Sequence, residues 1–274
     1  DIVENFEYQT LKDYYHKWYR PDLQAIIVVG DIDADAVLAK VKEMFSDIPA
    51  PVNPAEREYF TVPDNNEPIV SIVTDPEATA TRVTLYIKHD VIPDQVKNSQ
   101  AGLVASFIKN MASSMLSARL SEIAQKGDAP FAVAYASDGN FLVSKTKDAW
   151  TTMAISKEGK IDATLASLVR ENERVRQFGF TESEVERAKA EILKSYENAY
   201  NNRNKQQNNV YIDEYVTAFI DNQPIPGIEY EYNFVKQILP FLNAQAVNTF
   251  AKGVITDTNI AISVFGPEKE NIKY

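Results

Sequence analysis

The first 48 residues show helical, strand-like and again helical spacing of apolar positions. Aromatic side chains recur through residues 7–19, which predicts a helix. The run LQAIIVVG over residues 23–30 is short, apolar and rich in β-branched residues, which predicts a buried strand. Helical spacing then resumes, and Asp33 or Asp35 is expected to cap this second helix. Together these elements predict one compact α/β piece over residues 1–48.

Residues 49–68 break this pattern. They contain five prolines and little apolar periodicity, which is typical of an extended linker. We therefore expect three regions: the C-terminal part of a first domain (1–48), a proline-rich linker (49–68) and a second domain (69–274).

The second region begins with strand patterns, continues with helical patterns and closes with one more strand. Expected strands cover residues 69–74, 82–89, 131–137, 140–147, 150–156 and 259–265, with Gly139 in a turn. Expected helices cover residues 98–125, 161–178, 182–203, 207–221, 229–239 and 243–252. Thr181 and Glu184 match a capping box at the start of the third helix. This order predicts an α+β fold with one antiparallel or mixed sheet packed on helices.

Composition and charge narrow the possible function classes. Of 274 residues, 45% are hydrophobic, which excludes a mostly disordered chain. The net charge of −11 argues against a nucleic-acid partner. No stretch approaches the ~20 apolar residues of a membrane span. The chain has no cysteine, so disulfides, thiol nucleophiles and thiolate metal sites are excluded.

Histidine and aspartate patterns offer no metal site. Neither His16 nor His89 has a second histidine within two helical turns, so a two-histidine zinc cluster is not expected. The D-x-D-x-D sequence of residues 31–35 resembles the start of a calcium loop, but Ala36 and Lys42 stand where that loop needs glycine and an acid. Helix capping is the interpretation we favour for these aspartates.

Nucleophile and phosphate-binding motifs are absent as well. The sequence contains no G-x-S-x-G, G-x-G-x-x-G or G-K-[ST]. Acids crowd the helix start after residue 181, where they are expected to favour the helix dipole and face solvent; they are Glu182, Glu184, Glu186 and Glu191. We assign no catalytic, cofactor-binding or metal-ligating residue.

Three segments resemble the pitrilysin/insulinase family of zinc metallopeptidases. Residues 14–33, YYHKWYRPDLQAIIVVGDID, resemble the family's aromatic helix, Y-x-P, apolar strand and G-D-[IV]-D, and FSDIP follows at residues 45–49. Residues 117–123, SARLSEI, and 179–189, GFTESEVERAK, resemble two further family motifs. The closing strand with Gly266-Pro267 also fits. The matches occur in the family's order from about residue 8 to 267.

The resemblance implies a zinc site outside this sequence. The family carries zinc on an H-x-x-E-H helix, which lies upstream of the segment where this chain begins, and no such motif is present here. The family's substrate-contacting Arg and Tyr align with Ala124 and Phe131, which supply neither a cation nor a hydroxyl group. The chain is thus expected to be the later part of a zinc-bearing half, cut from a longer polypeptide. The alternative is a half that has lost both features.

The resemblance also implies a function and partners. The parent enzyme would close two halves around an unfolded peptide, which would add as a strand to an exposed sheet edge. This segment would build the chamber wall, with zinc, the zinc-bearing domain and the second half supplied by the rest of the parent polypeptide. A periplasmic or exported location is implied by likeness to bacterial members, and self-association through the incomplete first domain is expected. The alternatives are a non-catalytic scaffold or binding subunit, and an independent hydrolase with an unrecognised carboxylate pair.

Overall fold

A computed structural model describes residues 2–269 and 272, and these residues form two compact units. Residues 59–201 and 226–269 form the sheet unit, and residues 2–58 and 202–225 form the helical unit. The expected domain boundaries at residues 48 and 68 stay a prediction.

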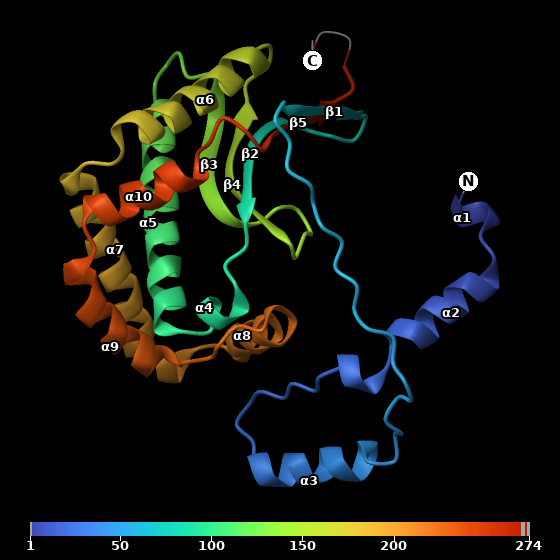
Figure 1. The fold of residues 1–274 in the computed structure, drawn as a ribbon. Helices are drawn as coiled ribbons and strands as arrows, with labels where there is room; N and C mark the ends of the chain where they lie inside the picture. The colour runs from blue at the N-terminus through green and yellow to red at the C-terminus, as the bar shows by residue number, and fades with distance from the viewer. Residues whose placement is uncertain (1, 270–271, 273–274) are drawn as a thin grey trace. The chain divides into compact units, whose positions relative to one another are not determined.

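The sheet unit is built on a five-stranded mixed sheet, which confirms the α+β fold class (Figure 1). Its strands are β1 (Ile69–Asp75), β2 (Thr81–Asp90), β3 (Phe131–Asn140), β4 (Lys147–Ser156) and β5 (Ile260–Pro267). They lie in the order β1-β5-β2-β4-β3, with β1 parallel to β5 and the other pairs antiparallel. The last strand in the sequence therefore lies inside the sheet, between the first two.

The helices of the sheet unit lie on one face of the sheet (Figure 1). They are α4 (Asp94–Lys97), α5 (Gln100–Ala124), α6 (Ile161–Phe178), α7 (Glu182–Asn201), α9 (Ile228–Ile238), the 3₁₀ turn η3 (Leu239–Phe241) and α10 (Ala244–Val254). Helices α5, α6 and α10 contact strands, while α7 packs on α5 and α9 on α7. The positions of α5, α6, α7, α9 and α10 agree with the sequence patterns, whereas the short elements α4 and η3 were not expected.

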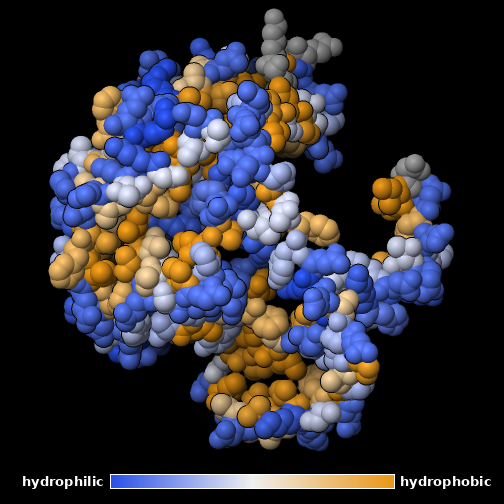
Figure 2. Space-filling view, viewed as in Figure 1, coloured by the Kyte–Doolittle hydropathy of each residue, from blue (hydrophilic) through white to orange (hydrophobic). Residues whose placement is uncertain are grey.

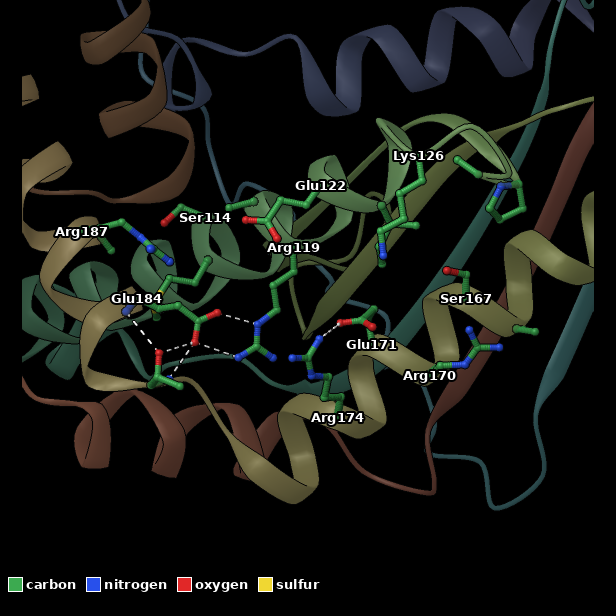
Figure 3. A pocket seen from close by; sticks show the side chains of 18 of the residues that line it. Ser114, Arg119, Glu122, Lys126, Ser167, Arg170, Glu171, Arg174, Glu184 and Arg187 are labelled. Atoms are coloured by element: carbon green, nitrogen blue, oxygen red, sulfur yellow. Dashed lines mark hydrogen bonds and ion pairs between the residues drawn. The ribbon is translucent and has the colours of Figure 1, made fainter.

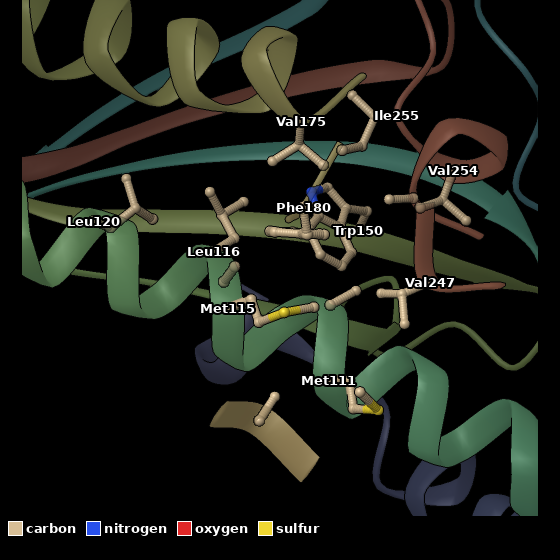
Figure 4. Close-up of a cluster of buried hydrophobic side chains, with 14 of the residues drawn as sticks. Met111, Met115, Leu116, Leu120, Trp150, Val175, Phe180, Val247, Val254 and Ile255 are labelled. Atoms are coloured by element: carbon tan, nitrogen blue, oxygen red, sulfur yellow. The ribbon is translucent and has the colours of Figure 1, made fainter. Parts of the chain in front are cut away.

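The core lies between the sheet and α5, α6 and α10 (Figure 4). On β2, the alternating residues Val83, Leu85 and Ile87 are all buried, as their spacing predicts. Trp150 is fully buried, and its indole N–H donates to Oδ1 of Asn172 at 2.7 Å. This hydrogen bond satisfies the one polar group of the largest core side chain.

The segment between residues 131 and 156 forms two strands where three were expected. Strands β3 and β4 are ten residues each and pair in an antiparallel hairpin. Gly139 lies within β3, opposite Ala149, whereas the turn falls at residues 141–146 with Leu142 at φ 53°. The prediction was wrong because glycine was taken as the turn signal, although the hairpin loop contains no glycine.

The helical unit has no buried residue among those described. It contains α1 (Ile2–Asn5), α2 (Tyr8–Trp18), the 3₁₀ turns η1 (Pro21–Leu23) and η2 (Arg203–Lys205), α3 (Ala34–Phe45) and α8 (Asn208–Asp221). The expected cap of α3 is confirmed, since the Asp33 carboxylate accepts from the backbone N–H groups of Asp35 and Ala36. The regular elements described in this unit are helices, and the strand expected between α2 and α3 is not assigned.

The predicted strand at residues 23–30 is wrong for this chain. The segment is not assigned to a strand, and Ile26 and Val28 are about half exposed, at 52% and 50%. A strand needs a neighbour to satisfy its backbone groups, and no strand of this chain pairs with it among the described residues. The helices α3 and α8 likewise expose apolar side chains, which are visible together in Figure 2.

Residues 49–68 contain neither helix nor strand, as expected for the linker. Their second half is nevertheless fixed to the sheet. The backbone N–H of Asn65 donates to the Asn259 side chain at 2.9 Å, and the Lys88 ammonium donates to the Pro63 carbonyl. These bonds explain why the sheet unit begins at residue 59.

Candidate functional site

The sheet unit contains a polar cleft of about 680 Å³ between α5, α6 and α7 (Figure 3). We call it the α5–α6–α7 cleft. Its floor contains the buried residues Met115, Arg119, Ser167, Glu171 and Ala188. Charged side chains line its rim: Glu122, Lys126, Asp128, Lys160, Arg170, Arg174, Arg187 and Glu191.

Arg119 and Glu184 form an ion pair at the floor of this cleft. Arg119 Nε donates to Glu184 Oε1 at 2.6 Å, and Arg119 Nη2 donates to Oε2 at 2.9 Å. Nη2 also donates to the Gly179 carbonyl at 3.0 Å, and the guanidinium lies 4.8 Å from the centre of the Phe180 ring. This bidentate geometry links α5 to the start of α7.

The capping box predicted for α7 is confirmed and shares Glu184 with that ion pair. The Glu184 N–H donates to the Thr181 hydroxyl, while the Thr181 N–H donates to the Glu184 carboxylate at 2.7 Å. Burial opposes ionisation of Glu184, but hydrogen bonds from Arg119 and Thr181 outweigh it and lower its pKa to about 2. The expectation that this acid faces solvent was wrong, because its carboxylate turns toward α5.

The turn between α6 and α7 holds this arrangement in place. Gly179 has φ 71° and ψ −163°, a region that is almost restricted to glycine. An added Cβ would lie 2.5 Å from the Asn248 side chain. That side chain accepts from the Phe180 N–H and donates to the Phe180 carbonyl. The backbone conformation of this turn thus explains why Gly179 and Phe180 begin the motif at residues 179–189.

Several cations in the cleft keep hydrogen-bonding capacity that no partner uses within the part of the chain that the structure describes. Arg119 is nine-tenths buried, yet its Nη1 has no hydrogen-bond partner there. Arg174 reaches Glu171 only at 3.5 Å. Four further cations on the rim form no ion pair among the described residues: Lys126, Lys160, Arg170 and Arg187.

A second charged cluster lies at the ends of β2, β3 and β4. His89 Nε2 is 2.8 Å from Asp138 Oδ2, and His89 Nδ1 is 3.0 Å from the Asp90 carbonyl. Lys109 Nζ on α5 is 2.5 Å from Asp138 Oδ1 and 3.5 Å from Asp148. Both ring nitrogens of His89 face acceptors, so the protonated ring fits best. Burial lowers the pKa of His89, but the hydrogen bond and charge of Asp138 outweigh it and raise the pKa.

These residues do not fit a zinc ion. The described residues contain no group of three His, Cys, Asp or Glu side chains that could hold a metal. Both nitrogens of His89 are engaged, and His16 lies on the exposed helix α2 of the helical unit. No catalytic step is therefore assigned to a metal on these residues. Glu184 and Glu171 are both turned toward arginines, which suits the cleft to binding charged groups better than to abstracting protons.

Comparison with known proteins assigns the family. The model of the peptidase M16 inactive domain matches residues 5–192. The chain belongs to this family. The resemblance of this M16 domain to pitrilysin/insulinase zinc metallopeptidases is thereby confirmed.

The relatives of this M16 domain are longer proteins. It is 26% identical over 268 residues to "Zinc protease PQQL-like" of Arabidopsis thaliana, covering 97% of this chain and 25% of that protein. It is 24% identical to "Probable zinc protease PqqL" of Escherichia coli strain K12, covering 90% and 26%. The chain thus spans about a quarter of the length of these curated relatives.

A solved structure shares its fold. The first half of the periplasmic protease PqqL from Escherichia coli superposes with a TM-score of 0.79 at 20% identity, covering 97% of this chain and 56% of that one. No helix within the described residues is long and apolar enough to cross a membrane.

The sequence motifs include Arg119 and Glu184, but they do not predict that these two residues meet in one cleft. Arg119 stood within the SARLSEI motif and Glu184 within the capping box, and their separation of 65 residues hid the contact. The available signal was a charged residue on the apolar side of a helix, since Met115, Leu116 and Leu120 surround Arg119 in sequence and are buried.

Proposed function

We propose that this M16 domain is a non-catalytic segment of a larger zinc metalloendopeptidase and builds part of its peptide-binding chamber. The match to the inactive-domain model over residues 5–192 carries this proposal. It is supported by the zinc proteases among its relatives, of which this chain covers about a quarter. The zinc ion and the H-x-x-E-H helix would lie elsewhere in the parent protein.

The edge strand β1 is suited to holding an extended peptide. Among the described residues it pairs with β5 alone, and four of its apolar side chains are half exposed: Ile69, Val70, Ile72 and Val73. An extended peptide can add to such an edge through main-chain hydrogen bonds. The opposite edge is partly occupied, because the Ser117 hydroxyl bonds both the N–H and the carbonyl of Ala136 on β3.

The helical unit supports the proposal that the rest of the parent polypeptide is a partner. Its apolar side chains are exposed, among them Phe45 at 44% and Phe219 at 52%, and none of its described residues is buried. Surfaces of this kind are typical of interaction sites. Location in the periplasm, or export, is proposed from likeness to the Escherichia coli protein, which is described as periplasmic.

The test is peptide hydrolysis by the full-length parent protein. A parent lacking residues 69–267 should lose cleavage of an unfolded peptide. Since this deletion can also impair folding, the sharper variant is Ile72→Lys, which places a charge on the β1 edge and should lower kcat/KM about tenfold or more. The matched control is Val133→Lys on β3, where Val133 is 56% exposed.

Three results would contradict the proposal. One is unchanged kcat/KM in Ile72→Lys, which would remove β1 as the peptide site. Another is full cleavage by the deletion variant, which would remove the chamber-wall role. A parent that contains no zinc by elemental mass spectrometry would favour the scaffold or binding subunit instead.

A further inference from the structure

We propose that the α5–α6–α7 cleft binds the C-terminal carboxylate of a short peptide. This site lies within the sheet unit, and its ligand does not depend on the activity of the parent protein.

The unpartnered nitrogen of Arg119 is the first argument. A buried donor without an acceptor costs about 1–3 kcal/mol, and more when it is charged. Arg119 uses Nε and Nη2 for Glu184 and Gly179, which leaves Nη1 as the one guanidinium nitrogen without a partner. Because Nη1 is itself buried, a ligand oxygen would remove this penalty once a small shift of the Arg119 side chain turns Nη1 into the cleft.

The neighbouring Arg174 is the second argument. Figure 3 shows the ends of the Arg119 and Arg174 side chains pointing toward one another on the wall of the cavity. Each guanidinium already has one carboxylate partner, Glu184 for Arg119 and Glu171 for Arg174, and a further anion between the two cations would reduce their remaining repulsion. The Arg174 side chain is 58% exposed and holds Glu171 only at 3.5 Å, so it is free to turn toward a carboxylate.

The acids of the cleft select a peptide over a simple anion. Glu171 is buried, and Glu122, Asp128 and Glu191 lie on the rim. These carboxylates repel a multiply charged anion such as phosphate, whereas they accept hydrogen bonds from the N–H groups of a peptide. The carboxylate of a peptide can bind the arginines of the cleft, while its amide N–H groups can donate to the acids. The cleft volume of about 680 Å³ lies within the usual range for small-molecule sites.

The experiment is isothermal titration calorimetry on the 274-residue chain with acetyl-trialanine. Saturable binding of the free acid is expected, with at least tenfold weaker binding of the matched C-terminal amide and of inorganic phosphate. Arg174→Gln should weaken binding of the acid about tenfold, while Lys252→Gln, an exposed change on α10 outside the cleft, should leave it unchanged. Arg119→Lys should also abolish the preference for the acid, with folding checked by circular dichroism.

Equal affinity for the acid and the amide would overturn the proposal, and so would tighter binding of phosphate. The absence of saturable binding at millimolar peptide would also overturn it, and an Arg174→Gln variant with unchanged affinity would show that the peptide does not bind between Arg119 and Arg174.

Discussion

Arg119 is a charged side chain among apolar neighbours. The free-energy cost of burying its charge is offset by one carboxylate partner, Glu184. Removing one member of a buried pair leaves the other charge uncompensated. Glu184 supplies both oxygens of the bidentate contact and caps α7 at the same time. One carboxylate therefore stabilises two elements.

We predict that Glu184→Gln lowers the free energy of unfolding by about 3 kcal/mol at pH 7. Urea denaturation measures this change, and Glu186→Gln, which removes an exposed pair with Lys189, is the control. Because the pKa of Glu184 is lowered to about 2, its contribution is present above about pH 4.5 and is lost as the pH falls toward 2. A difference between the two variants that persists at pH 2 would contradict this assignment.

His89 predicts the opposite pH dependence. Its pKa is raised, so its contribution to stability is full below its ordinary pKa of about 6.5 and is lost as the pH rises through the raised value. The groups that face it are Asp138 on β3, Asp148 on β4, Lys109 on α5 and the carbonyl of Asp90.

We expect the free energy of unfolding to fall between pH 6 and 9 in the wild-type chain, and His89→Gln to lower it by about 2 kcal/mol at pH 6 and less at pH 9. His16→Gln on the exposed helix α2 is the control. If both variants follow the same pH curve as the wild type, His89 is not the titrating group.

At the scale of the elements, the sequence predicted local patterns well and pairing partners poorly. Helices α5, α6 and α7 carry apolar stripes and caps of their own, so their positions followed from local spacing. The run at residues 23–30 has strand composition, but a strand forms only where a neighbour exists, and that information lies outside the run. The cleft was missed for the same reason, since α5 and α7 meet only in the folded chain.

The turn between α6 and α7 gives a prediction of its own. Gly179→Ala should lower stability by about 2 kcal/mol or more, because the added Cβ meets a rare backbone conformation and also the Asn248 side chain. Gly159→Ala is the matched control, with φ 67° and nothing within 4 Å of the added carbon, and should lose about 1 kcal/mol. Thermal unfolding compares the two, and equal losses would mean that the contact with Asn248 is unimportant.

For the whole molecule, the unequal burial of the two units predicts unequal stability. The sheet unit contains every buried residue among those described, while the helical unit has none. Amide hydrogens of α2, α3 and α8 should exchange much faster than those of α5, as measured by hydrogen exchange.

The exposed apolar surface of the helical unit should also drive association of the isolated chain. Phe219→Ser on α8 should raise the dissociation constant of the self-associated form about tenfold in sedimentation experiments. The control is Phe178→Ser in the sheet unit, where Phe178 is 78% exposed. A strictly monomeric wild-type chain at all concentrations would disprove this expectation.

The place of β5 inside the sheet has a consequence for synthesis on the ribosome. Strand β1 is synthesised long before β5, the strand with which it pairs among the described residues. The sheet stays incomplete until β5 has been synthesised. Until then β1 and one edge of β2 have unpaired backbone groups, which can form non-native strand pairs. A nascent chain that ends just before residue 260 would therefore leave β1 separated from the other strands, because β5 is the strand that joins β1 to β2.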